Sequence, residues 1–408
     1  MALSPILVPF LLIPIFLGSV FAISPLKTDT LKPGQQLRDW EQLVSAGEAF
    51  TLRFFTPRES STFLLGSGAG LRYICIWSQS DPVWVGNPTE PVSDSSGSLS
   101  IDTNGALKIT RANASPIMVS PHLSLAGNVS ATLLDSGNFV IRDTGRGGGG
   151  PGRVLWQSFD HPTNILLPGM KIGFNLKTKK EISVTSWTSN QVPTPGGAFR
   201  LGLDPSGANQ LLVWRHGEIY WSSGILTNNG SSQLTLELSR RYNIDYEFKF
   251  HSDKRMNYFS YSVKKTKGSV SSSWFLDTLG QITVTNSFRS STCAGGTSES
   301  SGPCKKDLKS SSAICIAEKP TACRKGTEYF EPRRGYMMDN AYYGDGLSSG
   351  ISDCHGSCWR NCSCIAFQSF PRGQCHYWGK GSKFVPYDSI NVEQIVYVLD
   401  SEIVKATM

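Results

Sequence analysis

The chain has 408 residues and a formal net charge of +7, with 39% hydrophobic and 17% charged residues. At about 150 residues per domain, this length allows two or three domains that are each large enough for a core of their own. The charge is mild for the length, and no basic stripe alternates with aromatic residues on a recognised motif. Composition therefore disfavours nucleic-acid binding.

The first 22 residues form an apolar run that ends in Val20-Phe21-Ala22, with small residues at the positions that a signal peptidase reads. This predicts a secretory signal peptide at residues 1–22. After it, no apolar run approaches the roughly 18 residues needed to span a bilayer, and the C-terminal segment carries Asp400 and Glu402. We therefore expect a secreted, extracellular protein that folds where disulfides form.

Short apolar alternations broken by Gly, Asn, Asp and Pro run through the chain, and long helical periodicity is scarce. This pattern is typical of an all-β protein. Apolar and polar residues alternate over 99–101 and again over 107–109, with Asn104-Gly105 between them, which predicts a hairpin. The same design recurs at 133–141, 203–207 and 277–284. Repeated hairpins predict repeated sheets.

Two segments rich in glycine or serine predict boundaries between domains. Residues 145–152, GRGGGGPG, cannot pack a core or hold one backbone conformation, so we expect a flexible loop or linker between an N-terminal β domain and a second one. Residues 290–312 are rich in Ser and Gly around Cys293 and Cys304, which indicates a loop held by bridges. A cysteine-rich module is expected beyond this loop.

Nine of the ten cysteines lie at or beyond Cys293, which leaves Cys75 alone in the long N-terminal part. This division predicts that disulfides stabilise a small C-terminal module while the rest relies on apolar burial. Cys75 lies between Ile74 and Ile76 and is expected to be a buried free thiol that acts as a small hydrophobe. A bridge from Cys75 to the C-terminal module is the alternative.

Five cysteines within 22 residues must either form bridges or hold a metal: Cys354, Cys358, Cys362, Cys364 and Cys375. His355 and His376 flank cysteines, and zinc sites are built from such residues. However, one residue separates Cys362 from Cys364, whereas zinc-binding cysteine pairs are typically about two to four residues apart. An oxidising compartment also favours disulfides, so we expect no metal.

Four sequons predict N-glycosylation, and they fit a surface that meets the glycosylation machinery. Their asparagines are Asn113, Asn128, Asn229 and Asn361. A further Asn-x-Thr match at Asn87 is excluded because proline follows the asparagine.

No catalytic motif stands out in the sequence. There is no Gly-x-Ser-x-Gly elbow, no His-Glu-x-x-His pair and no glycine-rich loop followed by Lys-Ser or Lys-Thr. The signature segments of a protein kinase are also missing. We therefore expect a protein that binds and does not catalyse, with no cofactor.

Two blocks give the sequence a family resemblance. Residues 43–55, LVSAGEAFTLRFF, together with 83–87, VWVGN, resemble the bulb-type lectin domain, a β-prism of three antiparallel sheets. Residues 156–170, WQSFDHPTNILLPGM, together with 185–187, TSW, resemble the S-locus glycoprotein region, which supplies a second lectin-like prism. Nearly the whole mature chain thus resembles the extracellular region of plant G-type (bulb-type) lectin S-receptor-like serine/threonine kinases.

Residues 354–375, followed by Tyr377-Trp378, resemble the PAN (apple-like) domain, in which two nested bridges join a helix to a small sheet. The resemblance implies the pairs Cys354–Cys375 and Cys358–Cys364, and Cys362 then needs a partner upstream. A bridge that closes a loop of about 15 residues contributes roughly 3 kcal/mol. Family members usually carry a six-cysteine EGF-like module before this domain, but only four cysteines occur here, so we expect that module to be degenerate or absent. The pairing stays open for Cys75, Cys293, Cys304, Cys315, Cys323 and Cys362.

The resemblance implies a mainly β fold, with two β-prism domains followed by a small disulfide-linked α+β domain. The expected divisions are a signal peptide at 1–22, a bulb-type lectin domain at 23–144, a glycine-rich linker at 145–152, an S-locus glycoprotein domain at 153–290, a cysteine-containing connector at 291–335 and a PAN domain at 336–408.

Bulb-type lectins hold mannose with the pattern Gln-x-Asp-x-Asn-x-Val-x-Tyr, and the best match here begins at Leu134. Ser136, Asn138 and Val140 stand at the Asp, Asn and Val positions, and Arg142 replaces Tyr. Each hydroxyl left unpaired costs about 1–3 kcal/mol, so sugar binding at this degenerate site is disfavoured.

The surviving residues of this pattern also have a structural explanation. Asn138 suits the turn after Gly137, and Val140 is expected to be a strand residue that faces the core. Around Asp102 the match is poorer still, with Asn104 and Ala106 at the Asp and Asn positions. We favour the structural explanation for Asn138 and Val140.

The resemblance implies a recognition protein of the type used in pollen recognition or defence signalling. Its expected partner is an extracellular protein ligand or a receptor kinase, with carbohydrate binding and homodimer formation as further options. Two alternatives stay open, a truncated model of a transmembrane receptor kinase at the plasma membrane and a mannose-binding lectin. Transcript mapping past Met408 separates the first alternative from a secreted protein, and a glycan array tests the second.

Overall fold

The computed structural model describes most of the chain with gaps, and a few single residues lie within those gaps. The ranges are 28–57, 70–78, 81–122, 129–143, 152–188, 195–227, 244–264, 272–278, 280–284, 314–315, 323–324, 330–339, 341–343, 350–370, 374–387 and 395–399, with single residues at 145, 193, 230, 235, 239 and 328. The predicted signal peptide, Asn128, Asn229, Cys293 and Cys304 lie outside the described residues.

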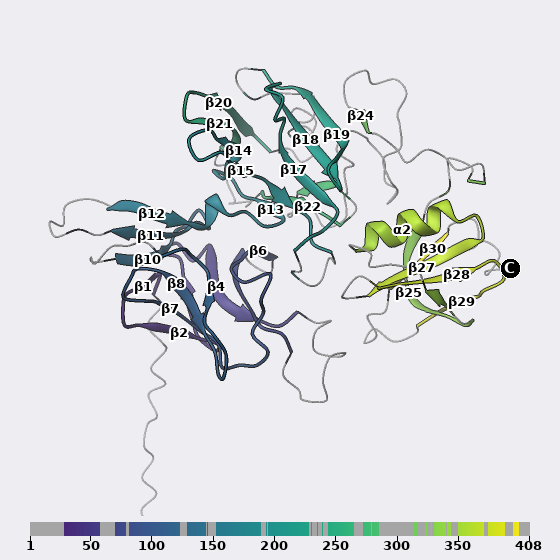
Figure 1. The fold of residues 1–408 in the computed structure, drawn as a ribbon, viewed down its shortest axis with the longest axis horizontal. Helices are drawn as coiled ribbons and strands as arrows, with labels where there is room; N and C mark the ends of the chain where they lie inside the picture. The colour runs from purple at the N-terminus through teal and green to yellow at the C-terminus, as the bar shows by residue number, and fades with distance from the viewer. Residues whose placement is uncertain are drawn as a thin grey trace, which may run out of the picture.

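The N-terminal part is a β-prism, and among the described residues it has three antiparallel sheets of four strands (Figure 1). The first sheet contains β3 (Gln42–Val44), β4 (Phe50–Phe55), β5 (Tyr73–Ser78) and β6 (Asp81–Val85). The second contains β2 (Gln36–Arg38), β7 (Ser98–Ile101), β8 (Leu107–Thr110) and β9 (Ile117–Met118). The third contains β1 (Thr30–Leu31), β10 (Val129–Leu133), β11 (Phe139–Asp143) and β12 (Arg153–Gln157).

A second prism follows a short 3-10 helix, η2 (Ser158–Asp160), and again has three antiparallel sheets in the described part of the chain. One contains β13 (Ile165–Leu166), β22 (Trp274–Leu276) and β23 (Ile282–Val284). Another contains β15 (Lys180–Ile182), β14 (Ile172–Asn175), β21 (Met256–Val263) and β20 (Tyr246–Ser252). The last contains β16 (Val184–Thr185), β17 (Phe199–Leu203), β18 (Gln210–Arg215), β19 (Glu218–Ile225) and β24 (Ile314–Cys315).

The C-terminal module is a single antiparallel sheet with the helix α2 (Ile351–Arg360) packed on one face (Figure 1). In spatial order the strands are β26 (Tyr342–Tyr343), β28 (Gln374–Gly379), β27 (Cys364–Phe370), β30 (Ile395–Leu399), β25 (Phe330–Met337) and β29 (Phe384–Pro386). The strand β25 begins at Phe330, inside the segment that we expected to be the connector. In the described residues, no helix is both long and apolar enough to cross a membrane.

The four predicted hairpins are confirmed, and they share one turn geometry. They join β7 to β8, β10 to β11, β17 to β18 and β22 to β23. Each turn holds a glycine with a φ of 78° to 88°: Gly105, Gly137, Gly207 and Gly280. At two of them a side chain would also collide, because a Cβ at Gly137 would lie 2.7 Å from Phe50 and one at Gly280 would lie 2.5 Å from Phe199.

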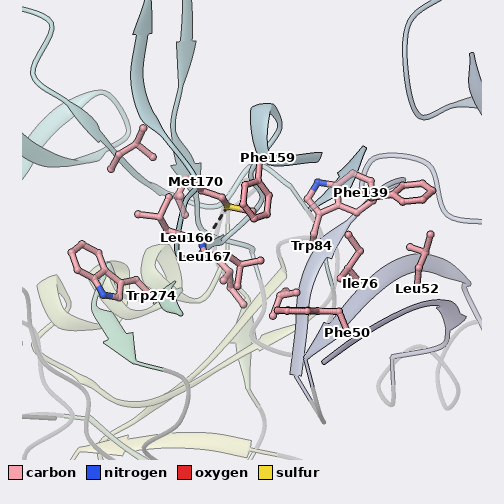
Figure 2. Close-up of a cluster of buried hydrophobic side chains, with 14 of the residues drawn as sticks. Phe50, Leu52, Ile76, Trp84, Phe139, Phe159, Leu166, Leu167, Met170 and Trp274 are labelled. Carbon is pink, nitrogen blue, oxygen red and sulfur yellow. Dashed lines mark hydrogen bonds between the residues drawn. The ribbon is translucent and has the colours of Figure 1, made fainter. Parts of the chain in front are cut away.

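One continuous apolar cluster fills both prisms, which are therefore packed against each other. It includes Phe50, Leu52 and Ile76 from the first prism together with Leu166 and Trp274 from the second (Figure 2). The alternation of buried and half-buried residues along β4 and β10 places their apolar side chains in this core. The mainly β prediction is therefore confirmed for the described chain.

The expected boundary between the prisms differs from the structure at one strand. We expected the second domain to begin at residue 153, after the glycine-rich segment. Instead β12 pairs with β11, with Ile141 opposite Trp156 and Val140 opposite Gln157. The segment 145–152 thus stands between two paired strands of one sheet, because the apolar edge of β11 needs a partner strand.

Candidate carbohydrate face and disulfide module

The residues predicted from the mannose pattern lie at the start of β11 and in the turn before it. Phe139 and Ile141 point into the shared core, so strand alternation places Val140 on the opposite face, beside Thr132 and Gln157. Val140 is nevertheless only 1% exposed. Val140 is thus a buried strand residue, as a core-facing residue would be, but its side chain lies on the face of the sheet opposite Phe139 and Ile141.

Hydrogen bonds within the protein occupy the amide group of Asn138. Its Nδ2 donates to Oε1 of Gln157 at 2.9 Å. Its Oδ1 accepts from the hydroxyl of Ser158 and from the backbone N–H of Phe159, both at 3.3 Å. With 8% of its surface exposed, Asn138 connects the turn before β11 to the end of β12.

The other positions of the pattern offer little to a sugar. Ser136 is exposed and carries no charge, so the carboxylate that would accept hydroxyl protons is missing. The guanidinium of Arg142 donates to the backbone oxygen of Gly152 at 3.4 Å. The structure therefore brings Ser136, Asn138 and Val140 to the start of β11 and the turn before it, without forming the donor and acceptor set that the pattern requires.

The poorer match around Asp102 is a turn. One carboxylate oxygen of Asp102 accepts the backbone N–H groups of Asn104, at 2.9 Å, and Ala106, at 3.0 Å. Asp204 has the same role in the second prism, where it accepts from the backbone of Ser206 at 2.8 Å. These aspartates close hairpins.

Sequence reasoning missed a set of buried serines that accept hydrogen bonds from backbone N–H groups at or next to the first residue of a strand. The hydroxyl of Ser158 accepts from Phe139 at 2.9 Å, that of Ser120 from Leu107 at 2.8 Å, and that of Ser223 from Leu211 at 3.0 Å. All three serines are at most 3% exposed. The two members of each pair are 12 to 19 positions apart in the sequence, so no fixed spacing could have revealed them.

Three disulfides are present in the described part of the C-terminal module. Cys354 pairs with Cys375 and Cys358 with Cys364, the same pairs that the family resemblance implies. Cys323 pairs with Cys362, at a Cα–Cα distance of 5.7 Å, which gives Cys362 the upstream partner it needed. This last bridge attaches the described end of the connector to the C-terminus of α2.

Arg324 follows this bridge and closes the C-terminal end of α2. Its guanidinium donates to the backbone oxygens of Cys358 (3.1 Å), Trp359 (3.2 Å), Asn361 (3.1 Å) and Cys364 (2.7 Å). The last carbonyls of a helix have no partner within the helix, and a cation there also complements the helix dipole. Arg324, which is 8% exposed, is thus a cap supplied from outside the helix.

The first turn of α2 contacts the second prism. The backbone N–H of Ile351 donates to Thr188 at 3.4 Å, and a guanidinium nitrogen of Arg215 donates to the backbone oxygen of Ser352 at 3.1 Å. The imidazole of His216 lies 2.8 Å from the carboxylate of Asp353. This set of contacts joins the disulfide module to the turn between β18 and β19.

Cys75 is fully buried and unpaired among the described cysteines, as we expected. Burial raises the pKa of its thiol far above the usual value, although Arg53 lowers it slightly. A thiol in this state is a poor nucleophile and packs as an apolar group. No group of three or more His, Cys, Asp or Glu residues in the described chain could hold a metal ion.

Two of the predicted glycosylation asparagines are described, and both are exposed. Asn113 lies in a turn with a φ of 54°. Asn361 follows α2, and its side-chain oxygen accepts from the backbone and hydroxyl of Ser363 at 3.1 and 2.7 Å. Modification of these asparagines stays a prediction.

Comparison with known families gives a match to the D-mannose binding lectin model over residues 82–188. This match includes β12 and crosses the glycine-rich segment, in agreement with the sheet pairing. Among solved structures, the chain is similar to a monomeric mannose-binding lectin from Gastrodia elata, with 16% identity, a TM-score of 0.23 and coverage of 32% of this chain and 96% of that one. It is also similar to a two-domain fetuin-binding lectin from Scilla campanulata, with 12% identity, a TM-score of 0.22 and coverage of 62% and 94%.

Two curated relatives from Arabidopsis thaliana show the similarity to known proteins. The G-type lectin S-receptor-like serine/threonine-protein kinase At1g67520 is 41% identical over 58% of this chain and 28% of its own length. A second kinase of the same description, At2g19130, is 31% identical over 95% of this chain and 48% of its own length. The chain thus spans about half the length of these relatives or less. It is similar to the ectodomains of the G-type lectin S-receptor-like serine/threonine kinases.

Proposed function

We propose that this chain is an extracellular recognition module that binds a protein cue, of the type used in pollen recognition or defence signalling. A receptor kinase would relay the bound state to the cell interior. The proposal is supported by similarity to receptor-kinase ectodomains across nearly the whole chain. Association into a homodimer belongs to the same proposal.

The observation that favours a protein cue over mannose is the state of Asn138. In the mannose pattern this amide must bond to sugar hydroxyls, whereas here it bonds to Gln157, Ser158 and Phe159. A sugar would have to replace bonds that already exist, and the partners left unpaired would each cost about 1–3 kcal/mol. We therefore propose that the face around Ser136, Asn138 and Val140 does not bind mannose.

Exposed apolar side chains on the second prism and on the C-terminal module also fit a protein partner. Ile225 is 66% exposed, Met338 64% and Tyr343 69%. Aromatic residues and methionine are enriched in protein–protein interfaces. Scattered apolar residues are also common on monomers, so these side chains support the proposal only together with the similarity to ectodomains.

A glycan array and surface plasmon resonance with the secreted chain test the proposal. We expect no mannose-competed signal from the wild-type chain. The variant Leu134→Gln, Ser136→Asp, Arg142→Tyr restores the missing side chains of the pattern, and adding Gln157→Ala frees the Nδ2 group of Asn138. Weak mannose binding that appears only in the fourfold variant would support our explanation, whereas mannose-competed binding by the wild-type chain would overturn it.

A further inference from the structure

The three disulfides of the C-terminal module differ sharply in their access to solvent. The sulfur-bearing residues of two bridges are buried: Cys354, Cys358 and Cys364 are 0% exposed and Cys375 is 7% exposed. Cys323 and Cys362, which form the third bridge, are both exposed. Thiol–disulfide exchange requires a thiolate to reach a sulfur atom, so access decides which bridge reacts first.

The exposed bridge also has a distinct structural role. The two buried bridges connect α2 to its own sheet, because Cys354 and Cys358 lie in α2 while Cys375 and Cys364 lie in β28 and β27. The bridge from Cys323 instead joins a segment before the module to the residue after Asn361, the C-cap of α2. Its loss would leave the helix and sheet bridged to each other.

Arg324 depends on the same bridge for its position. It donates to four backbone oxygens at the end of α2 and the start of β27, and it lies between the bridge at Cys323 and the strand β25, which begins six residues later at Phe330. Without the bridge, Arg324 would be tethered to the module only on its C-terminal side, by the short segment that leads to β25, and holding it against these carbonyls would cost more conformational entropy.

We propose that Cys323–Cys362 is a site of thiol–disulfide exchange with a small dithiol, and that its reduction releases Arg324 from the end of α2. One thiolate of the dithiol attacks a sulfur of the bridge, the S–S bond breaks, and the other cysteine leaves as a thiolate. The second thiol of the reductant then attacks the mixed disulfide. The reductant leaves as its own disulfide, having supplied two electrons and two protons, and both cysteines become thiols.

Dithiothreitol is the probe in the test, applied to the intact secreted chain at rising concentrations under native conditions. Alkylation followed by peptide mass mapping reports which cysteines have become free. We expect Cys323 and Cys362 to be labelled on the order of tenfold faster than the four buried cysteines. Equal or earlier labelling of Cys354, Cys358, Cys364 or Cys375 would overturn the proposal.

Trypsin reports the release of Arg324 in the same samples. We expect cleavage of the bond after Arg324 to be slow in the oxidised chain and to rise together with the labelling of Cys323 and Cys362. Cleavage after Lys179, which is exposed in the turn between β14 and β15 of the second prism, serves as the control and should not change with reductant. The double variant Cys323→Ala, Cys362→Ala should be cleaved after Arg324 without reductant. Continued resistance at Arg324 once both cysteines are alkylated would overturn the proposed release.

Discussion

The prisms and the C-terminal module are stabilised in different ways. The prisms share one continuous apolar cluster. Apart from Cys315 in the edge strand β24, the one cysteine in the described part of the prisms is Cys75, a buried free thiol. The C-terminal module has two smaller apolar clusters, on the two faces of its sheet, and three disulfides. A domain of about 70 residues buries proportionally less surface than a larger one, so crosslinks supplement its core.

This contrast predicts where each kind of substitution acts. A truncation in the shared core should destabilise both prisms together, because their apolar side chains form one cluster. Loss of a bridge should act on the C-terminal module alone. The following changes test that contrast, from the largest expected effect to the smallest.

Trp274→Ala should have the largest effect. Trp274 is 1% exposed and stacks on Tyr261, with 4.7 Å between the ring centroids. Truncation of a buried tryptophan typically costs about 3–5 kcal/mol in unfolding free energy. Urea denaturation would measure the cost, and the control Trp40→Ala removes a side chain that is 73% exposed. Equal costs for the two variants would contradict the described core.

Replacing Cys354 and Cys375 together by alanine should lower the stability of the C-terminal module by about 3 kcal/mol. Hydrogen exchange measured by mass spectrometry would show faster exchange in α2 and its sheet, with the prisms unchanged. Cys75→Ala is the matched control, because it removes a buried sulfur that forms no bridge. Faster exchange throughout the prisms would show that the module and the prisms do not unfold separately.

Ser158→Ala should lower the stability of the prisms by about 1–3 kcal/mol, since it leaves the backbone N–H of Phe139 buried without its acceptor. The cost would be read from the urea midpoint. Ser136→Ala, at an exposed serine two residues before Asn138, should change stability by no more than about 0.5 kcal/mol. If Ser158→Ala left the urea midpoint unchanged, water would have to replace the hydroxyl as the acceptor for this N–H group.

Lowering the pH should produce the smallest loss of stability, because it protonates the carboxylate of Asp204. Burial alone would raise the pKa of this carboxyl group, but hydrogen bonds from Gln210 and Ser206 outweigh burial and lower it below its ordinary value of 3.8. The stabilisation is therefore fully present above pH 3.8 and is lost as the pH falls through the folded-state pKa. Asp204→Asn should flatten this part of the stability profile, measured by urea midpoints in acid. If stability fell with pH equally steeply in this variant, other carboxylates would be responsible for the loss of stability in acid.

Features that depend on local sequence could be predicted. Asn104-Gly105 and its three counterparts predicted hairpins, because positive φ at glycine is a property of the turn itself. The buried state of Cys75 followed from its apolar neighbours. The PAN resemblance implied two bridges that the structure contains, since their spacing within one short segment carries the information.

Features that depend on contacts between distant residues could not be predicted. Nothing near Asn138 shows that Gln157 and Ser158 bond to its amide, because these partners lie 19 and 20 positions away, across the glycine-rich segment. The same segment suggested a domain boundary by composition, although β11 and β12 pair across it. The face on which Val140 lies is set by the register of β11. The alternating pattern in the sequence does not fix this register, and a shift of one residue would move Val140 to the other face.

The pairing of β12 has a consequence for how the polypeptide is made and dissected. A nascent chain that has emerged only as far as residue 144 has β1, β10 and β11 but lacks the strand that completes their sheet. The first prism can therefore close only after residues 153–158 have left the ribosome. For the same reason, a recombinant lectin fragment should extend through η2, because one that stops at the glycine-rich segment would expose an open strand edge and remain prone to aggregation.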